Sequence, residues 1–223
     1  MNIFKVTILL FLFICVLVAF AWSQKKVSEL TLVYNYAVLS VASEPAPPAN
    51  GIAATHSIYV KGNMSRSQLQ SAQFSSATIY DNKTGIAVVL REVSGQKLLI
   101  RMTPENWEDK NKRYQGLQYT PTGTSKVIAG YHCQQATAKT LDGFSITVFY
   151  TTELIPDNKE YDPQFKNLEG LPLEYEITNG HVVIRYTLAS INLNPVPASR
   201  FDIPKSGYRE MTYDESKRLN IGG

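Results

Sequence analysis

The sequence has few of the side chains from which metal centres and covalent active sites are built. Its 223 residues include two cysteines, Cys15 and Cys133, and three histidines, His56, His132 and His181. A structural zinc site needs three or four convergent ligands, and no histidine here has a second His or Cys at ligand spacing. The chain also has no GxSxG elbow, no HExxH pair and no glycine-rich phosphate loop. We therefore predict no catalytic residues, no metal site and no cofactor.

The chain also lacks a large excess of charge of either sign. It has 22 Lys and Arg against 19 Asp and Glu. Without Lys5, which lies in the N-terminal segment, 21 basic residues remain, an excess of two. The densest basic stretch, DKNKRY at 109–114, also carries Asp109. Because phosphate binding needs clustered Lys and Arg, we predict no nucleic-acid partner.

Long apolar runs are absent except at the N-terminus, where residues 6–20 form one. Lys5 precedes this run, and Ala21-Trp22-Ser23 supplies small residues at the positions that signal peptidase reads. The run is shorter than the roughly 20 residues needed to span a bilayer, which favours a cleaved signal over a membrane anchor. We predict a signal peptide at 1–23, and no transmembrane span after its cleavage. A single domain is expected at 24–223.

Loss of the signal peptide would remove Cys15 and leave Cys133 without a partner for an internal disulfide. Three interpretations of this thiol remain: a buried and inert side chain, an exposed thiol that pairs between chains, or a reactive thiol. His132 could activate it only from the same side, and neighbours in a strand point to opposite faces. We favour burial, because free cysteine is among the most buried residue types.

Helical periodicity is also scarce. No window of a dozen residues after the signal peptide shows it strongly, whereas alternation of apolar and polar residues recurs along the chain. The pattern predicts eight to ten strands joined mostly by short turns, and therefore an antiparallel sheet. We expect single strands at 28–41, 56–68, 95–103, 126–139 and 144–154. We expect hairpins at 75–93, which turns within Asp81–Gly85, and at 171–193, which turns at Asn179-Gly180.

The connections differ in composition. Residues 44–55 are rich in Pro, Ala and Gly and predict a loop. Residues 104–114 form either a short helical turn or a loop, and 155–170 form a long polar connection. The C-terminal tail at 205–223 contains a brief helical candidate that begins near Thr212.

Four segments carry a family resemblance. They are IAGYHCQQATA, ITVFYTTEL, NLEGLPLEYEI and VPASRFDIPKSGYREMT, in this order. The run resembles the GLPGLI / domain-of-unknown-function-4412 group of exported bacterial proteins, typical of Bacteroidetes and similar to the outer-membrane lipoprotein-carrier (LolA/LolB-like) superfamily. The resemblance covers about residues 56–213 and is sharpest at GLPLEYEI and FDIP…GY. The family's Gly-Leu-Pro-Gly-Leu pattern reads Asn-Leu-Glu-Gly-Leu here, at 167–171.

The resemblance implies a mostly β fold, in which a curved antiparallel sheet forms a half-open barrel with a short helical or loop cover. Its concave face would be apolar and would hold a guest, or its residues would pack on one another as an ordinary core. The loops at 104–124 and 155–170 would cover this face or leave it partly accessible. The candidate ligand-binding residues on it are Val148, Tyr150, Leu173, Tyr175, Ile177, Ile184 and Tyr186.

The resulting functional hypothesis is a non-enzymatic exported envelope protein that binds or carries an apolar ligand, a lipid or a lipoprotein acyl chain. Binding would come from removal of apolar surface from water. The alternative is a structural or protein-interaction module of the bacterial envelope, with an envelope protein as its partner and no small ligand. Either function predicts a periplasmic, outer-membrane or surface-associated protein of a Gram-negative bacterium.

Overall fold

The computed structural model describes most of the chain outside its N-terminal segment. The described residues are 24–40, 54–180 and 182–219.

Three predicted segments lie wholly or partly outside the described residues. They are the signal peptide at 1–23, most of the loop at 44–55, and the last four residues of the tail at 205–223. Ala54 and Thr55, which the loop prediction included, already belong to a strand, so that prediction was wrong at these two positions. Within the described ranges, no helix is both long and apolar enough to cross a membrane.

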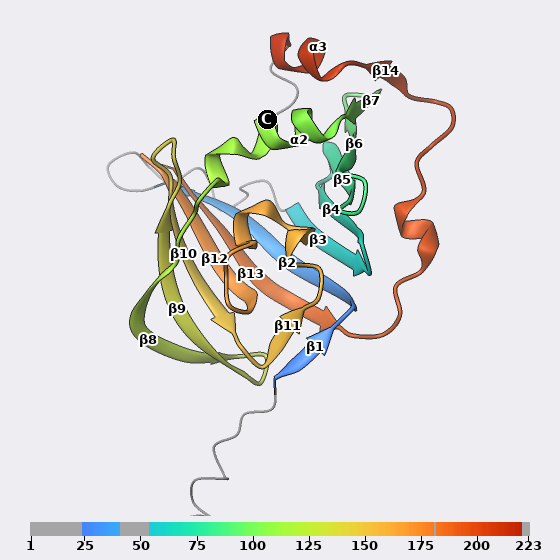
Figure 1. The fold of residues 1–223 in the computed structure, drawn as a ribbon. Helices are drawn as coiled ribbons and strands as arrows, with labels where there is room; N and C mark the ends of the chain where they lie inside the picture. Colours follow the sequence, from blue (N-terminus) through green and yellow to red (C-terminus); the bar gives the residue numbers. More distant parts are fainter. Residues whose placement is uncertain (1–23, 41–53, 181, 220–223) are drawn as a thin grey trace, which may run out of the picture.

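A single large sheet dominates the structure (Figure 1). It contains twelve strands, and all neighbours run antiparallel except the first two in its spatial order, which are parallel. In that order the strands are β14 (Arg209–Met211), β7 (Gln96–Met102), β6 (Ile86–Val93), β5 (Phe74–Asp81), β4 (Met64–Gln70), β3 (Ala54–Lys61), β2 (Glu29–Ser40), β13 (Val182–Asn192), β12 (Leu171–Asn179), β10 (Ser145–Thr151), β9 (Tyr131–Lys139) and β8 (Thr120–Ile128).

The sheet curls without closing. Its two edges, β14 and β8, pair with one neighbour each and not with each other, and Figure 1 shows β8 to β10, β12, β13 and β2 bent into a trough. The predicted fold class is therefore confirmed: a mostly β protein whose curved sheet forms a half-open barrel with a short cover.

Alternation of side chains gives the trough its apolar lining. On β12, Leu173 and Tyr175 are buried, and Glu174 between them points to the outer side, where it pairs with Lys126 at 2.7 Å. Tyr175 lies opposite Val148 on β10 and opposite Tyr186 on β13. Because side chains alternate across a strand, these cross-strand partners share the concave face.

The turn signals placed two hairpins correctly. The hairpin of β12 and β13 turns at Asn179-Gly180, where Gly180 has a φ of 56°. The hairpin of β5 and β6 turns at 82–85, where Gly85 has a φ of 72°. Glycine takes positive φ at little cost, which is why these turns can be tight.

Two segments that we expected to be single strands are hairpins instead. The segment 56–68 reverses at Gly62, which has a φ of 53°, and the segment 126–139 reverses at Ala129 and Gly130, which have φ values of 50° and 85°. The prediction read through these turns because apolar residues continue on both sides of them. With these two extra strands and the short strands at Lys25–Val27, Leu154–Pro156 and Arg209–Met211, the described residues hold fourteen strands, not eight to ten.

The concave face is covered by two connections. Residues 104–114, left open as helix or loop, form helix α2 (Pro104–Asn111) and the 3-10 turn η1 (Lys112–Tyr114). Thr103 caps α2 in a capping box with Asn106. The expected loop at 104–124 ends earlier than predicted, because β8 begins at Thr120.

The polar connection at 155–170 is folded rather than loose. It begins in β11 (Leu154–Pro156), which pairs in parallel with β1 (Lys25–Val27) as a separate two-stranded sheet. It continues as the 3-10 turns η2 (Lys159–Tyr161) and η3 (Pro163–Phe165). In Figure 1 this segment lies inside the trough.

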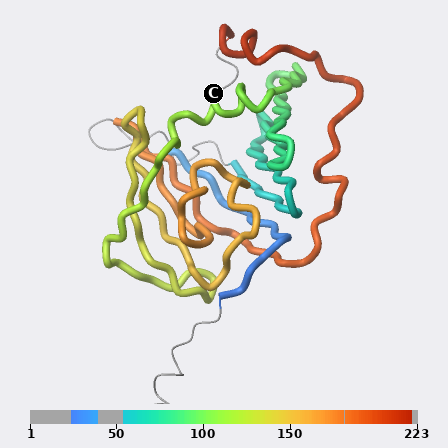
Figure 2. Tube along the Cα trace, in the orientation of Figure 1, coloured from blue at the N-terminus to red at the C-terminus, as the bar shows by residue number. Residues whose placement is uncertain are grey.

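The C-terminal part of the chain crosses the outer face of the other half of the sheet. After β13, the trace in Figure 2 runs along the outside past η4 (Ala198–Phe201) and returns at β14 beside β7. It ends in α3 (Tyr213–Arg218), whose N-cap is Thr212, as the sequence predicted.

Three clusters of buried side chains result. The largest fills the trough beneath the 155–170 segment and includes Leu32, Leu173 and Phe165. A second, around Phe201, lies between the outer face of β5 to β7 and the C-terminal segment. The third, around Met102, lies between the inner face of the same strands and α2, β14 and α3.

Candidate functional site

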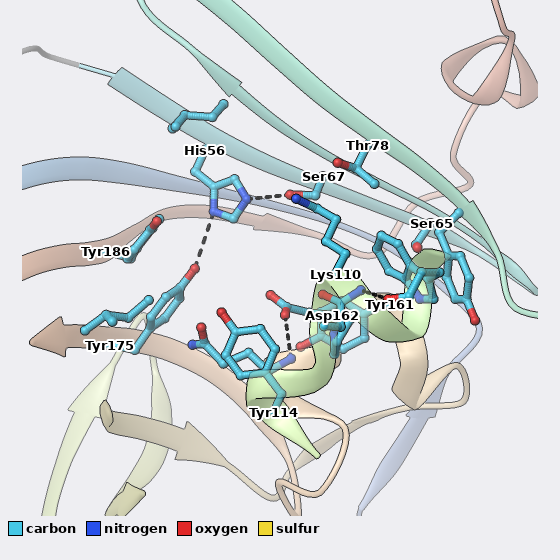
Figure 3. Close-up of a pocket in the computed structure, with 17 residues that line it drawn as sticks. His56, Ser65, Ser67, Thr78, Lys110, Tyr114, Tyr161, Asp162, Tyr175 and Tyr186 are labelled. Atoms are coloured by element: carbon cyan, nitrogen blue, oxygen red, sulfur yellow. Dashed lines mark hydrogen bonds between the residues drawn. The ribbon is translucent and has the colours of Figure 1, made fainter. Parts of the chain in front are cut away.

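A covered chamber lies between the concave face and its cover (Figure 3). Its volume is about 290 Å³. The floor comes from the inner faces of β3, β4, β5, β12 and β13, and the roof comes from α2, η1 and residues 161–164. The chamber is large enough for a small organic molecule, at the lower end of the range of ligand pockets.

Small side chains on β4 and β5 create this space. Ser65 and Ser67 occupy inward positions on β4, and Thr78 lies opposite Ser67 on β5. Elsewhere the same face carries Ile58 and Leu173, which are fully buried. Where the floor has short polar side chains in place of such large ones, the sheet and the roof cannot fill the gap between them.

Aromatic rings line the β12 and β13 side of the chamber. Tyr175 and Tyr186 stack with ring centroids 4.3 Å apart. Phe165 of the roof meets Tyr175 edge to face at 4.8 Å, and His56 of β3 meets Tyr186 edge to face at 5.3 Å. Rings held by several such contacts form a rigid wall.

His56 lies at the centre of a short polar chain on the floor. Its Nε2 is 2.8 Å from Ser67 Oγ, and its Nδ1 is 3.4 Å from the Tyr175 hydroxyl oxygen. Burial lowers the pKa of His56 to about 4, so the imidazole is neutral at pH 7. A neutral imidazole has one donor and one acceptor nitrogen, and the two contacts use one each.

Asp162 brings a carboxylate to the roof. Its Oδ1 accepts a hydrogen bond from the Gln164 backbone N–H at 3.0 Å, which caps η3. Burial raises the pKa of this carboxyl group to about 6. None of the ion pairs among the described residues includes Asp162.

Two buried polar atoms of residues that line the chamber have no hydrogen-bond partner. They are the Tyr161 hydroxyl and the Gln164 side-chain amide nitrogen. Each of these residues is only 5% exposed. A buried polar group without a partner costs about 1–3 kcal/mol, but both atoms are enclosed by the protein and do not face the open space of the chamber.

The chamber opens toward solvent through an aromatic threshold. Tyr80 and Trp107 stack there with centroids 4.6 Å apart, and Tyr114 lies beside them on η1. The same three residues line an outer groove of about 520 Å³, next to Glu160 and Lys166. Glu160 holds this rim in place, since it accepts from Lys166 Nζ at 2.6 Å and from the Tyr80 hydroxyl at 3.3 Å.

Comparison with known proteins gives fold likenesses only. No family model and no curated protein matches the chain. Among solved structures, PNGF-II is 13% identical with a TM-score of 0.49, and the match covers 85% of this chain but only 32% of that one. The chain therefore spans about a third of the length of PNGF-II.

The other structures that match include a MucA/MucB complex and a lipoprotein. MucB in the Pseudomonas aeruginosa MucA/MucB complex is 15% identical with a TM-score of 0.44, over 79% of this chain and 56% of that one. The Mycobacterium tuberculosis lipoprotein LppX is 11% identical with a TM-score of 0.32, over 75% of this chain and 88% of that one. The function proposed below rests on the chamber and not on these likenesses.

The seven predicted ligand-binding residues fall into three groups. Tyr175, Ile177 and Tyr186 line the chamber. Ile184 is half-buried and pairs with Ile177 across the β12–β13 hairpin. The remaining three do not line the chamber and are buried in the core of the trough: Val148, Tyr150 and Leu173.

Most polar residues that line the chamber were not predicted from the sequence. Ser65, Ser67 and Thr78 lie in segments that we recognised as strands, yet no residue of these segments was considered as a ligand-binding residue. Small polar residues at alternate positions of an otherwise buried strand were the available signal. For Asp162 and Gln164 no local signal exists, because a polar connection is normally solvated.

Cys133 is not part of the chamber. It lies on β9 in the core of the trough and is 1% exposed, whereas the His132 side chain is 62% exposed on the other face. Burial raises the pKa of the Cys133 thiol to about 11. The thiol is therefore buried and protonated, which agrees with the interpretation that the sequence favoured. In the described parts of the chain, no group of three or more His, Cys, Asp or Glu could hold a metal ion.

Proposed function

We propose that this protein is a non-enzymatic binding protein of the bacterial cell envelope that holds a small amphiphile in the chamber. The observation that carries this proposal is the cavity of about 290 Å³, whose lining combines aromatic rings with the polar side chains of His56, Ser67 and Asp162. A cavity that served packing alone would be apolar and empty, or filled by the protein's own side chains.

The lining favours an amphiphile over a bare hydrocarbon. Tyr175, Tyr186 and Ile177 offer apolar surface, but His56 and Asp162 face the same space (Figure 3). A hydrocarbon would place apolar atoms against the Asp162 carboxylate, which forms no ion pair among the described residues. We infer that the polar end of the ligand lies in the chamber and that its apolar body extends over the aromatic threshold into the outer groove.

The contact between Ser67 and His56 raises the question of an enzyme, because a hydroxyl beside an imidazole is the arrangement of a nucleophile and its base. Two observations argue against it. The third member of the chain is the Tyr175 phenol and not a carboxylate. Burial also lowers the pKa of His56 to about 4, which makes it a weak base at neutral pH. We therefore propose binding without chemistry, and expect no labelling of Ser67 by a fluorophosphonate.

Membership of the GLPGLI group is the finer part of the proposal. Gly170 is the glycine that this chain keeps from the family pattern. A Cβ atom at this position would lie 2.1 Å from the Thr151 carbonyl oxygen. The close approach of two backbone segments therefore requires glycine. This physical need supports the resemblance, and with it an exported protein of a Gram-negative envelope.

Native mass spectrometry tests the proposed function. The protein purified from a bacterial envelope fraction should carry an additional mass of a few hundred daltons. A Thr78→Phe variant, which fills the chamber from β5, should lose it. Ser75→Phe adds a ring on the opposite face of the same strand and should keep it. A native protein that is always free of ligand, or a Thr78→Phe variant that still carries it, contradicts binding in the chamber and favours the interaction-module alternative.

A further inference from the structure

Two hydroxyl groups lie next to each other on the floor of the chamber, those of Ser67 and Thr78. Ser67 on β4 and Thr78 on β5 are directly opposite in the sheet, and both residues line the chamber (Figure 3). Both are half-buried, so they keep surface that a ligand can reach, unlike the enclosed Tyr161 hydroxyl. Directly opposite residues have Cβ atoms about 4.5–5.5 Å apart, which lets one ligand group contact both hydroxyls.

His56 determines what the Ser67 hydroxyl offers to a ligand. Burial lowers the pKa of His56 to about 4, so its imidazole is neutral and has one donor and one acceptor nitrogen. Nδ1 lies 3.4 Å from the Tyr175 hydroxyl, and Nε2 lies 2.8 Å from Ser67 Oγ. With the proton on Nε2, the Tyr175 hydroxyl donates to Nδ1, and Nε2–H donates to Ser67 Oγ.

The other tautomer of His56 is unfavourable for Tyr175. With the proton on Nδ1, the Tyr175 oxygen would accept it. The hydroxyl proton of Tyr175, a residue that is only 3% exposed, would then have no acceptor among the described residues. An unsatisfied buried donor is costly. The Nε2 tautomer is therefore favoured, and it leaves the Ser67 O–H to donate into the chamber.

Thr78 adds a hydroxyl group that can both donate and accept. None of the hydrogen bonds among the described residues includes its side chain. The floor thus offers two donors and an acceptor on neighbouring strands. A ligand hydroxyl can accept from one and donate to the other, whereas a sulfate or carboxylate can only accept and a quaternary ammonium group can do neither.

The charged residues of the lining do not favour a head group of either sign. Asp162 and Lys110 give the lining one charged group of each sign. A head group with a single charge would meet a like charge as well as an opposite one. An uncharged head group avoids this repulsion, so hydroxyl groups match the polar floor best.

The aromatic wall suits the carbon skeleton of such a head group. Tyr175 and Tyr186 stack there, and His56 meets Tyr186 edge to face. The face of an aromatic ring carries partial negative charge, and the C–H bonds of a polyol are polarised in the positive sense by the oxygens beside them. A polyol can therefore pack its C–H bonds against the wall while its hydroxyls bond to the floor.

We propose that the chamber binds an uncharged, hydroxyl-rich head group, such as a glycerol or a single sugar ring, through the Ser67 and Thr78 hydroxyls. This inference rests on the proposed function, because it names the polar end of the amphiphile. The ligand class is a neutral polyol joined to an apolar chain.

Five probes with the same decyl chain separate the head-group question from binding itself. The uncharged polyols are 1-O-decylglycerol and decyl glucoside. Decyldimethylphosphine oxide is uncharged but only accepts hydrogen bonds, decyl sulfate is anionic and decyltrimethylammonium is cationic. In titration calorimetry below the micellar concentrations, one polyol should bind at least about tenfold more tightly than the three probes without hydroxyl groups. Which polyol it is distinguishes a glycerol head group from a sugar.

The failures of the two proposals are distinguishable in this series. Equal affinity for all five probes, or tightest binding of a probe without hydroxyl groups, overturns the inference and leaves the proposed function standing. Binding of none overturns the proposed function, and the inference with it.

Two variants test the hydroxyls directly. Thr78→Val removes one hydroxyl and keeps the branched shape of the side chain. It should weaken the tighter-binding polyol about tenfold through one lost hydrogen bond and leave decyltrimethylammonium unchanged. Ser67→Ala should act in the same direction, although it also removes the partner of His56 Nε2. Far-UV circular dichroism should match the unaltered protein for both variants, which separates a lost contact from a lost fold.

Thr147→Val provides the matched control. Thr147 is a half-buried threonine on β10, between Ile146 and Val148, which face the trough core, so its own side chain points to the outer face. This variant should change none of the five affinities. If Thr78→Val binds the polyol as tightly as Thr147→Val does, the Thr78 hydroxyl does not contact the head group and the inference is wrong.

Discussion

At the scale of single residues, burial has more influence on this protein than charge pairing. The ionisable groups inside the trough are shifted toward their neutral forms, because burial disfavours a charge that has no partner. Burial lowers the pKa of His56 to about 4 and raises that of Asp162 to about 6. The ion pairs, such as Arg185 with Glu176, lie on the outside and contribute little to stability.

The opposite shifts of His56 and Asp162 predict how stability depends on pH. The ordinary pKa of His56 is 6.5, so below that value the unfolded chain takes up a proton that the folded protein does not, and stability falls. The ordinary pKa of Asp162 is 3.8, so as the pH falls through 6 the folded protein takes up a proton first, and stability rises. Between pH 6.5 and 4.5 the two effects oppose each other.

Removing one of the two groups should reveal the effect of the other on the pH dependence of stability. We expect the free energy of unfolding of Asp162→Asn to fall by about 2 kcal/mol between pH 6.5 and 4.5, since His56 is then uncompensated. The unaltered protein should change much less over the same range. Urea unfolding at several pH values measures both. Parallel pH profiles for the two proteins would show that Asp162 does not titrate in this window.

Cys133 gives a second prediction at the residue scale. A thiol that is 1% exposed and has a pKa raised to about 11 should react slowly with a disulfide reagent at pH 7. Reaction should become fast in urea. Cys133→Ala should keep the fold and lose about 1–2 kcal/mol of stability through the lost volume. Fast labelling of the native protein that disappears in Cys133→Ala would contradict the buried thiol.

At the scale of elements, the cover depends on a few anchoring contacts. Tyr161, Phe165 and Leu168 of the 155–170 connection are buried in the trough core. Helix α2 buries no residue completely, and Trp107 attaches it to Tyr80 by stacking. These contacts hold the roof at a distance from the serines of β4, and the chamber is the space that remains.

Gly170 is where the cover rejoins the sheet, and it should not tolerate a side chain. Its Cβ position is 2.1 Å from the Thr151 carbonyl oxygen, which belongs to the backbone and cannot move aside independently. We expect Gly170→Ala to lose about 2 kcal/mol or more, as overpacking does. The exposed neighbour Glu169, changed to Ala, should cost less than about 0.5 kcal/mol. Equal urea midpoints for the two variants would contradict the close approach.

Asp109 joins the C-terminal helix to the roof. Its Oδ2 accepts from Lys217 Nζ at 2.8 Å and from the Tyr213 hydroxyl at 3.0 Å. These hydrogen bonds, with that from Lys112, hold the pKa of the Asp109 carboxyl well below its usual range.

We expect Asp109→Asn to loosen α3 and to raise amide hydrogen exchange in Tyr213–Arg218, since two of its contacts to that helix weaken. Exchange in β12 should stay unchanged, because that strand is far from the contact in the sheet order. Glu108→Gln, an exposed neighbour on α2, serves as the control. Unchanged protection of α3 in Asp109→Asn would mean that Met211 and Tyr213 hold the helix without this carboxylate.

At the scale of the whole molecule, the twelve-stranded sheet connects all three core clusters. Strand β3 belongs to both halves, since Ile58 and Val60 lie in the trough cluster and Tyr59 packs against the cluster around Phe201, so neither half is a separate layer. The outer C-terminal segment and the inner cover lie on opposite faces of β5 to β7. We therefore expect the chain from 24 onward to unfold as one unit.

Two probes of urea unfolding test this cooperativity. Trp107 fluorescence reports the roof of the chamber, and far-UV circular dichroism reports the sheet. Their transitions should coincide, with Trp107→Phe as the control for other fluorescence. An earlier transition at Trp107 would show that the cover opens before the sheet unfolds.

The amino-acid sequence by itself determined the local features. Alternation along 171–193, the turn at Asn179-Gly180 and the helix start at Thr212 are short-range patterns, and the structure contains all three. The curved half-open sheet was available only through the resemblance. Turns at Gly62 and Gly130 were missed because apolar residues continue across them.

Only the tertiary structure decided which inward-facing residues become core and which line a chamber. Val148 and Tyr175 are adjacent across two strands and follow the same alternating pattern, yet only Tyr175 reaches the cavity. The difference depends on what the roof places above each of them, and Asp162 and Lys110 arrive there from distant parts of the chain. Alternation specifies a face of a strand, whereas a cavity depends on the volumes of both surfaces that meet, and one strand's sequence carries no information about the second surface.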